Sequence, residues 1–263
     1  MKTDQVLKFE DVRFVRDGNV ILDGVNWSVN ENENWVLLGT NGSGKSTLLS
    51  MIPAYTYPTS GDVYVFGKKF GKYLWEKVKK DVGFLSSSLN DFNNTFYSQS
   101  VSDVIMTGKF ATARVFEKPG HGDFDKVERL VREFELERIK DRSFGVLSEG
   151  ERRRTLIARA FMADYKLLIL DEPCANLDIR ARERLLSSLR LKMEESETPL
   201  IYVTHQIDEI LPQITHVAIL DQGKIVIKGE KKKVLTDENL SDLYDTKLHI
   251  HWEDERPFTI IKS

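Results

Sequence analysis

The segment GTNGSGKS at residues 39–46 constrains the fold of this chain more than any other feature. It follows a continuous apolar run at residues 35–38, typical of a buried parallel strand, and runs into a helix-like stretch at residues 45–52 that Pro53 ends. Strand, glycine-rich loop and helix in this order fit the pattern G-x-x-x-x-G-K-[ST]. Glycines let the backbone pass close to a phosphate, so that N–H groups and the helix N-terminus face the anion. The segment therefore predicts a phosphate-binding loop.

The residue types of this loop indicate how a nucleotide would be held. Lys45 is expected to reach the β- and γ-phosphates of ATP, and the Ser46 hydroxyl is expected to ligate Mg²⁺. A glycine-rich turn without a ligand is the alternative, but the pattern arises by chance in only about one chain per hundred of this length. The predicted nucleotide contacts are Gly39, Thr40, Asn41, Gly42, Ser43, Gly44, Lys45, Ser46 and Thr47.

Two adjacent carboxylates follow a second apolar run, LLIL at residues 167–170. An Asp at the end of such a strand, beside the phosphate loop, can hold Mg²⁺ through water, which gives this role to Asp171. Glu172 is then placed to polarise an attacking water as a general base. Two acids after a core strand can also simply open a loop, which Pro173 starts, and for this motif alone the two interpretations have equal weight.

The wider pattern predicts one α/β domain. Alternating residues at 6–14 and 20–29 predict antiparallel strands, and short apolar runs separated by amphipathic stretches predict a mostly parallel sheet covered by helices. The chain is polar and helical between about residues 89 and 162, which indicates a helical insertion. We expect a domain over residues 1–230, with the insertion at about 89–162, and a C-terminal extension over 231–263.

Composition excludes several classes of protein. The chain has 263 residues and a net charge of −3, from 38 basic and 41 acidic residues, so nothing suggests a nucleic-acid partner. Its one cysteine, Cys174, excludes an internal disulfide framework and fits a reducing compartment. The N-terminus has no signal-peptide run, and no apolar run approaches the ~18 residues that span a bilayer. We therefore expect a cytoplasmic protein that reaches a membrane only through a partner.

The segment LSEGERRRTLIARA at residues 147–160 points to a family. It resembles the signature of ABC-type ATPases, commonly LSGGQ followed by a helix that ends in IARAL. The triplet NLD at residues 176–178 resembles the D-loop of these proteins, and His205 resembles their switch histidine. A lone histidine after an apolar strand is by itself more often structural than catalytic. The similarity runs in order from about residue 7 to residue 229, so that a chance match of all elements together is below roughly 1%.

The resemblance implies a RecA-type P-loop NTPase core with an N-terminal antiparallel β subdomain and an inserted helical subdomain. It also implies two subunits that face head to tail, with ATP between the phosphate loop of one and residues 148–151 of the other. Ser148 and Gly150 would then bind the γ-phosphate, and Asp178 would communicate across the dimer. Glu172 would be the catalytic base, and His205 would contact the γ-phosphate and position water. Completing the site across an interface couples ATP binding to closure and hydrolysis to opening.

Three positions depart from the family pattern. The adenine-stacking aromatic aligns near Arg16, with Phe14 on the same strand face; either can stack, because guanidinium planes also lie on rings, and Phe14 is slightly favoured. Ser87 stands where the Q-loop glutamine is expected, and its side chain is too short to reach the metal without a bridging water. Glu149 and Glu151 bring negative charge towards a triphosphate unless they cap their own helix.

The single set of motifs predicts a homodimer or a pairing with a second ATPase subunit. The chain lacks the long coiled coil of repair ATPases and the second ATPase domain of translation-associated ABC proteins. It therefore resembles the ATP-binding subunit of a transporter whose membrane-spanning subunits are separate chains, and residues 229–243 resemble the tail of iron-chelate, vitamin B12 and molybdate importer ATPases. A non-transport ABC ATPase acting in assembly, repair or regulation is the alternative, which the missing Q-loop glutamine favours.

Overall fold

A computed structural model describes residues 5–86, 95–110 and 119–262 of the chain. Its centre is a six-stranded sheet in the order β10-β9-β3-β8-β7-β6, in which β9, β3, β8, β7 and β6 are parallel and β10 is antiparallel to β9. The parallel strands are short and almost entirely apolar, because both faces of the sheet are covered. The strands are β3 (Trp35–Leu38), β6 (Val82–Ser86), β7 (Leu167–Asp171), β8 (Leu200–Thr204), β9 (His216–Asp221) and β10 (Lys224–Glu230).

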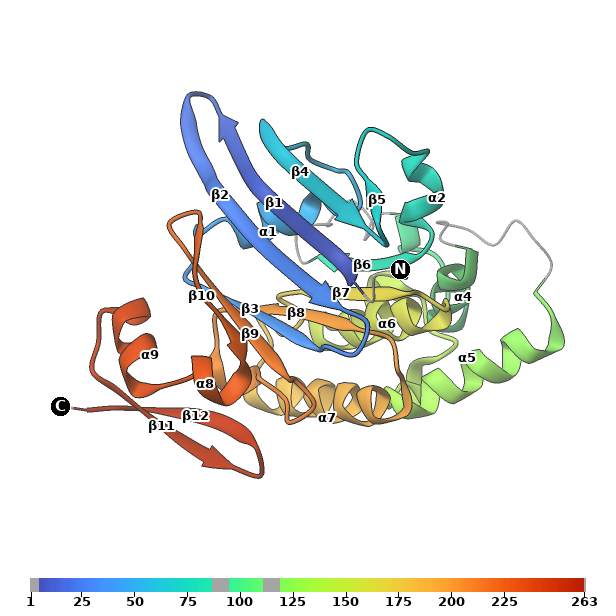
Figure 1. The fold of residues 1–263 in the computed structure, drawn as a ribbon. Coiled ribbons are helices and arrows are strands. Elements are labelled where there is room, and N and C mark those ends of the chain that lie inside the picture. Colours follow the sequence, from blue (N-terminus) through green and yellow to red (C-terminus); the bar gives the residue numbers. More distant parts are fainter. Residues whose placement is uncertain (1–4, 87–94, 111–118, 263) are drawn as a thin grey trace.

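A second, antiparallel sheet covers one face of the first (Figure 1). Its order is β2-β1-β4-β5, and its apolar side chains alternate along each strand so that one face is buried. The short helix α1 (Lys45–Ser50) lies between the two sheets, and its Leu48 and Leu49 belong to one apolar cluster with residues of both. The strands are β1 (Gln5–Arg16), β2 (Asn19–Asn30), β4 (Ser60–Val65) and β5 (Lys68–Lys69).

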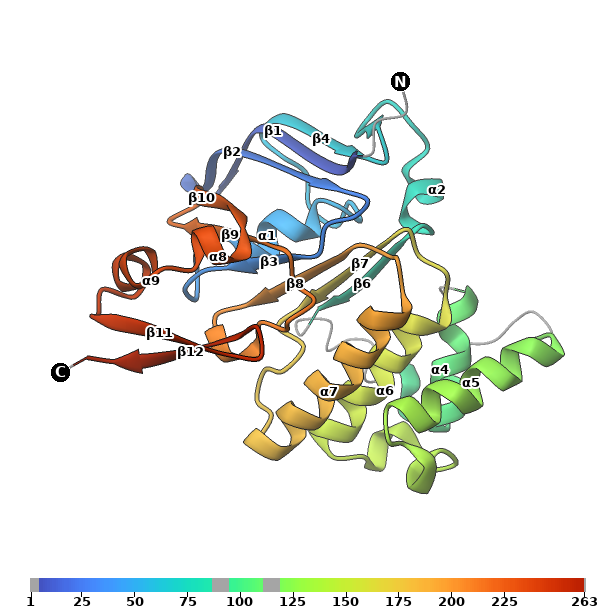
Figure 2. The same ribbon diagram turned by 60° about the horizontal axis from the view of Figure 1, so that its bottom comes forward.

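Helices cover the opposite face of the six-stranded sheet (Figure 2). Three of them begin at a polar residue whose side chain accepts a main-chain N–H hydrogen bond: Ser100 for α4, Ser148 for α6 and Asp178 for α7. Their apolar faces and the sheet form one continuous core. The helical segments on this face are α4 (Val101–Thr107), η1 (Gly108–Phe110), α5 (His121–Glu133), η2 (Glu137–Ile139), η3 (Phe144–Val146), α6 (Glu149–Met162) and α7 (Ile179–Glu195). The short helix α2 (Trp75–Lys79) instead packs with the apolar cluster between the two sheets.

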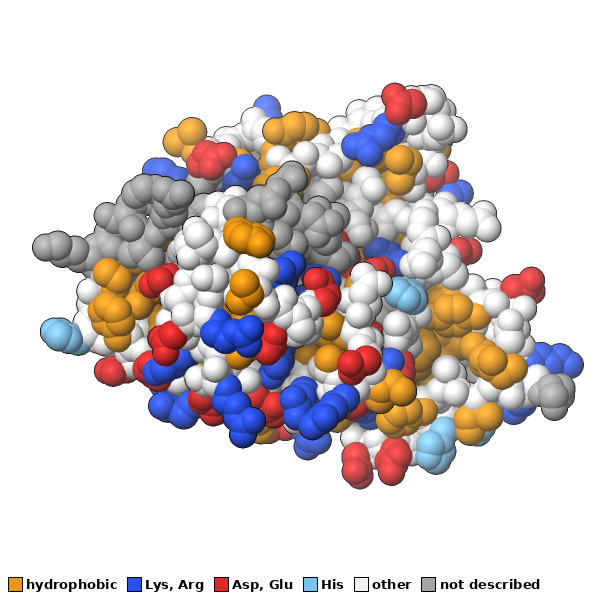
Figure 3. Space-filling view, turned by 180° about the vertical axis from the view of Figure 1, so that it is seen from behind, with side chains coloured by type: hydrophobic (Ala, Val, Ile, Leu, Met, Phe, Trp, Pro, Cys, Tyr) orange, Lys and Arg blue, Asp and Glu red, His pale blue; other side chains and the backbone are white. Residues whose placement is uncertain are grey.

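The outer surface of these helices is charged with both signs. Seen from behind, Lys or Arg and Asp or Glu side chains lie next to one another along the lower edge of the molecule (Figure 3). On α7, Arg190 pairs with Glu194 at 3.2 Å, and Lys192 pairs with Glu133 of α5 at 2.9 Å. Within the described residues, no helix is both long enough and apolar enough to cross a membrane.

The C-terminal extension (residues 231–262) packs beside β10 and the start of α7 (Figure 1). Leu240 and Leu248 anchor it in the same core as the helices. It borders the connection from β8 to β9, which contains only the short helix η4 (Ile207–Glu209). Its elements are α8 (Lys231–Val234), α9 (Asp237–Tyr244), β11 (Leu248–Glu253) and β12 (Arg256–Ile261).

The α/β fold with an antiparallel β subdomain and helical segments is the one that the sequence predicts. The first helix is shorter than expected: it ends at Ser50 and not at residue 52. Residues 51–54, which include Pro53, form a turn, and Ala54 takes a positive φ of 59°. β9 and β10 form a hairpin that extends to Glu230.

Candidate nucleotide site at the carboxyl edge of the sheet

The candidate site lies where β3, β7 and β8 end at the same edge of the parallel sheet. The loop after β3 carries Lys45, Glu172 follows β7, and His205 follows β8. The Lys45 Nζ lies 3.8 Å from the Glu172 Oε1, and the His205 Nδ1 lies 3.3 Å from the same oxygen. Carboxyl ends of parallel strands are the usual position of ligand sites in α/β sheets. Three residues that are far apart in the chain therefore meet within hydrogen-bonding or ion-pairing distance.

The loop after β3 has a backbone that only glycine permits. Gly44 has a φ of +104°, and a Cβ there would lie 2.9 Å from the Leu22 side chain. A Cβ on Gly39 would lie 2.2 Å from the main-chain oxygen of Leu220, in the neighbouring strand β9. The loop is thus wrapped tightly against β2 and β9, which explains why the glycines of the motif stand at these positions.

Lys45 is held inside this loop. Its side chain is 5% exposed, and its ammonium donates hydrogen bonds to the main-chain oxygens of Gly39 and Thr40, both at 2.9 Å. Burial lowers the pKa of Lys45 below its ordinary value, and the carboxylates of Glu172 and Asp171 oppose this shift. The loop therefore presents a buried cation next to two carboxylates, a position from which it can bind an anion.

A cleft of about 640 Å³ opens beside Lys45. Six of the nine predicted nucleotide contacts line it, namely Asn41, Gly42, Gly44, Lys45, Ser46 and Thr47, together with Glu172. The cleft is not lined by the other three residues of this loop, Gly39, Thr40 and Ser43.

Four further lining residues were missed by sequence reasoning: Val20, Ile21, Gln222 and Gly223. The main-chain N–H of Gly223 donates to the Ser43 oxygen at 3.1 Å, and that of Asp23 donates to the Gly223 oxygen at 3.0 Å. The turn after β9 therefore links the phosphate loop to β2. A signal existed, because the apolar run of β9 ends in a Gln-Gly turn, and the carboxyl end of a strand next to β3 belongs to the same edge.

Glu172 occupies an unusual backbone conformation. Its φ is +48°, in the left-handed region that costs a non-glycine residue about 1–3 kcal/mol. Its N–H donates to the Val203 oxygen of β8 at 3.0 Å, which holds the strained turn next to His205. Asp171, the last residue of β7, is 1% exposed. The strain directs the Glu172 carboxylate towards Lys45 and His205 rather than along the strand.

A buried polar cluster supports the strands behind His205. The Glu209 Oε2 accepts hydrogen bonds from the hydroxyls of Thr204 (2.7 Å) and Tyr202 (3.0 Å). Burial raises the pKa of Glu209 and raises the pKa of the neighbouring Cys174 thiol to about 12. The only cysteine is therefore a thiol at neutral pH and not a nucleophile.

The two residues considered for adenine stacking differ in exposure. Phe14 is 9% exposed and belongs to the core between the sheets. Arg16 is exposed, and its guanidinium carbon lies 5.7 Å from the centre of the Phe14 ring. Arg16 pairs with Asn19 at the hairpin turn next to Val20, which lines the cleft. This geometry favours Arg16 over Phe14 as the surface that a base can contact.

The signature segment lies outside the cleft. The Ser148 hydroxyl donates to the Glu151 carboxylate at 2.8 Å, and the Ser148 N–H donates to the same oxygen at 2.8 Å, which forms a capping box at the start of α6. These hydrogen bonds lower the pKa of Glu151. Glu149 lies 3.7 Å from Arg153 of its own helix. Both acids thus contact their own helix, as one of the two alternatives for this segment predicts.

The signature segment contacts the D-loop. A Cβ built on Gly150 would lie 3.3 Å from the Ala181 Cβ and 3.8 Å from a Leu177 methyl group. Asp178 is exposed and accepts the N–H of Ala181 at 2.8 Å as the N-cap of α7. The starts of α6 and α7 therefore form one surface, which Ser148 and Asp178 share. Ser87, the residue in the place of the Q-loop glutamine, lies outside the described residues.

Comparisons with known proteins identify the family of the chain. The family profile for ABC transporters matches residues 22–175. The chain is 40% identical over 255 residues to an ABC transporter ATP-binding protein of Bacillus subtilis, YlmA, with 96% of each chain covered. It is 33% identical to the protein YmeB of Lactococcus lactis, named likewise, with 97% of this chain and 98% of that one covered.

Solved structures show the same fold. The structure of cbiO1 from Clostridium perfringens, part of the ABC transporter complex cbiONQ, superposes with a TM-score of 0.75. Its sequence is 28% identical to this chain, and the match covers 91% of this chain and 94% of cbiO1. A structure described as a metal-chelate type ABC transporter has a TM-score of 0.73 and 26% identity, with 98% and 97% covered. The chain belongs to the ABC transporter family and is one of its ATP-binding, ATP-hydrolysing proteins.

Proposed function

We propose that the chain energises transport through separate membrane-spanning subunits, and that it works as a pair with a second copy at the cytoplasmic face of the membrane. One observation carries this proposal. Lys45 and Glu172 line the cleft, and His205 contacts Glu172 at 3.3 Å, whereas Ser148 and Gly150 neither line the cleft nor contact these side chains. The exposed start of α6 is therefore free to complete the site of a second chain, as the resemblance to ABC-type ATPases implies.

In this proposal the substrate is ATP, with its phosphates in the cleft beside Lys45. The Lys45 ammonium neutralises charge on the β- and γ-phosphates as the bond to the γ-phosphate breaks. Glu172 accepts a proton from the attacking water, because its side chain lines the cleft beside Lys45. His205 contacts the γ-phosphate and keeps the water in line. Both side chains leave the sheet from adjacent strands, so their relative position is set by β7 and β8.

The side chains of Ser46 and Asp171 carry oxygen atoms that fit Mg²⁺. The exposed Ser46 hydroxyl lines the cleft, and the Asp171 carboxylate lies at the end of β7, next to Glu172. Hydroxyl and carboxylate oxygens are the ligands that this cation prefers. Mg²⁺ bound there would neutralise charge on the phosphate oxygens.

The partner copy is proposed to contribute Ser148 and Gly150 to the γ-phosphate, with Asp178 of each chain at the interface. The contact between Gly150 and the D-loop supports this, because a movement at one is transmitted to the other through packed atoms. We assign residues 1–230 to the ATPase domain, about 89–162 to its helical subdomain, and 231–263 to an extension.

Transport is supported by the names of the relatives and by the ABC transporter complex of which cbiO1 is part. The test is purification of the tagged chain from detergent-solubilised membranes, followed by ATPase assays with and without what co-purifies. We expect a protein with several spanning helices that binds the chain and stimulates hydrolysis. A chain that hydrolyses ATP at its full rate alone, and retains no membrane protein, would instead support a non-transport ATPase.

Arg16→Ala is expected to raise the KM for ATP roughly fivefold and leave kcat unchanged, because an exposed guanidinium stacks on the base in both ground and transition states. Phe14→Ala is expected to lower stability by about 3–5 kcal/mol through a core cavity, with a smaller effect on KM. Steady-state kinetics and thermal unfolding separate the two effects. A raised KM in Phe14→Ala at unchanged stability would reverse the assignment.

Glu151→Gln is expected to lower the KM for ATP by roughly threefold to tenfold, because it removes a negative charge from the helix end that approaches the triphosphate. The amide oxygen still accepts both Ser148 hydrogen bonds, so the capping box is kept. The effect should shrink as salt is raised. Glu151→Ala is the control, since it removes charge and cap together and is expected to lower stability by about 1 kcal/mol. An unchanged or higher KM in Glu151→Gln at low salt would show that the Glu151 charge does not approach the nucleotide.

A further inference from the structure

The C-terminal extension contacts the segment that carries His205. This switch segment, residues 205–212, connects β8 to β9 and has only η4 as regular structure. Three side chains of the extension donate hydrogen bonds to its main-chain oxygens: Tyr244 to His205, Arg256 to Asp208, and Lys231 to both Leu211 and Pro212. A loop with few internal hydrogen bonds is thus held by a part of the chain outside the ATPase core.

The Tyr244 contact is made on His205 itself. The Tyr244 hydroxyl, at the end of α9, donates to the His205 main-chain oxygen at 2.8 Å. Burial raises the pKa of Tyr244, so this hydroxyl is protonated at neutral pH and can donate. The other side of the same residue faces the site, where the His205 Nδ1 lies 3.3 Å from the Glu172 Oε1. A shift of the His205 oxygen therefore moves its ring relative to Glu172.

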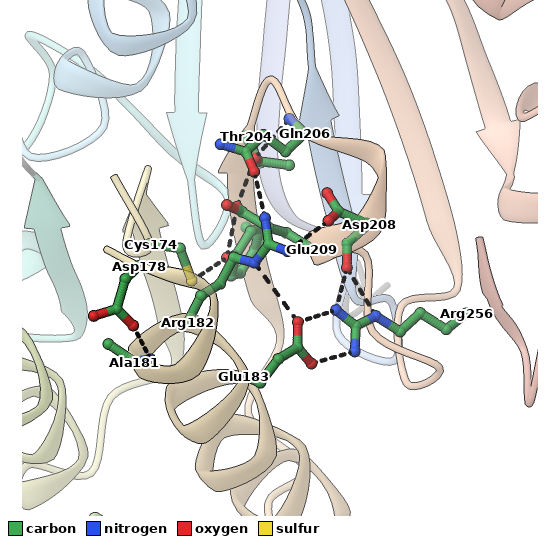
Figure 4. A network of polar contacts seen from close by, with 11 residues as sticks. Cys174, Asp178, Ala181, Arg182, Glu183, Thr204, Gln206, Asp208, Glu209 and Arg256 are labelled. Carbon is green, nitrogen blue, oxygen red and sulfur yellow. Dashed lines mark hydrogen bonds and ion pairs between the residues drawn. The ribbon is translucent and has the colours of Figure 1, made fainter. Parts of the chain in front are cut away.

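Arg256 joins the switch segment to α7. Its guanidinium makes two hydrogen bonds to the Glu183 carboxylate, at 2.7 and 2.8 Å, and two to the Asp208 main-chain oxygen, at 2.8 and 2.5 Å (Figure 4). From the other side, Arg182 of α7 contacts the Asp208 carboxylate at 2.8 Å and the Gln206 amide oxygen at 2.8 Å. The planar guanidinium satisfies a carboxylate and a carbonyl at once, which an ammonium cannot reproduce. Residues 206–208 are therefore clamped between α7 and the extension.

We propose that Tyr244 and Arg256 are positioning residues for ATP hydrolysis, which hold the switch segment so that the His205 side chain stays beside Glu172. The inference rests on the role proposed above for His205. Neither residue lines the cleft, so both act through the main chain of the switch segment. Small displacements of catalytic groups lower rates strongly, because the barrier depends on their alignment with the reacting atoms.

The experiment compares Tyr244→Phe with two controls, using the full purified chain. Tyr244→Phe removes one hydroxyl and keeps the ring, so we expect kcat to fall roughly fivefold, with KM for ATP within about twofold of wild type. Arg256→Lys keeps the charge but not the fork, and is expected to change kcat in the same direction. Ser241→Ala removes hydrogen bonds to Asp237 and Leu248, both inside the extension, and should leave kcat unchanged.

The outcomes separate this inference from the proposals on which it rests. His205→Ala with wild-type turnover would overturn the role of His205, and this inference with it. A lowered kcat in His205→Ala, together with wild-type kcat in Tyr244→Phe and Arg256→Lys, would overturn this inference alone. An equal loss of kcat in Ser241→Ala would also overturn it, because the extension would then act through general stability.

Discussion

Lys45→Ala is expected to abolish steady-state ATP hydrolysis, with a loss of at least about a hundredfold in kcat and most of the nucleotide affinity. The reason is the position of the side chain. Lys45 is 5% exposed, and its ammonium lies between the loop oxygens of Gly39 and Thr40 and the carboxylate of Glu172. A buried cation at that point acts on phosphate charge with little screening by water.

Two controls make the Lys45 experiment decisive. Circular dichroism and thermal unfolding show whether Lys45→Ala remains folded, since the substitution also removes the hydrogen bonds to Gly39 and Thr40. Lys79→Ala removes a cation that pairs with Glu76 on α2, away from the cleft, and should keep wild-type kinetics. Near-normal turnover by folded Lys45→Ala would contradict the proposal that the phosphates of ATP lie beside Lys45.

Glu172→Gln is expected to lower kcat by about 10²–10⁴-fold while ATP binding is kept. The amide preserves the shape of the side chain and its place near His205 and Lys45, but it cannot accept the proton of the attacking water. Because the substitution removes a negative charge next to the triphosphate, ATP is expected to bind more tightly. Single-turnover hydrolysis and equilibrium binding of a fluorescent ATP analogue measure the two effects separately. Wild-type hydrolysis in this variant would remove Glu172 from the reaction.

Much of the core could be predicted from the sequence, because its signals are local. The apolar runs of β3, β7, β8 and β9 have lengths that suit short buried strands, and the glycine positions in the loop follow from a close backbone approach. The motifs then placed Lys45 and Glu172 after β3 and β7, which end at the same edge of the sheet with β8 between them. The Lys45 Nζ lies 3.8 Å from the Glu172 Oε1. Each of these motifs is formed by residues close together in the chain, so each can be recognised without knowledge of the tertiary structure.

Other features depended on tertiary contacts and were not predicted. Phe14 and Arg16 lie on one strand face in the sequence pattern, but only the packing of the β subdomain on the core shows that Phe14 is buried under Arg16. Gln222 and Gly223 line the cleft only because β9 lies next to β3 in the folded sheet. The contacts of Tyr244 and Arg256 join residues 39 and 48 positions apart, with no motif to indicate them.

We propose that ATP is held between two copies of this chain, with the signature helix of one completing the cleft of the other. The most direct measurement is the mass of Glu172→Gln in solution, by light scattering with and without ATP and Mg²⁺. We predict that ATP shifts this variant to twice the monomer mass. Adding Ser148→Asp, which keeps an N-cap residue on α6 but places a carboxylate towards the γ-phosphate, should prevent the shift. A Glu172→Gln variant that binds ATP and stays monomeric at high concentration would contradict the claim, and so would a double variant that still forms the dimer.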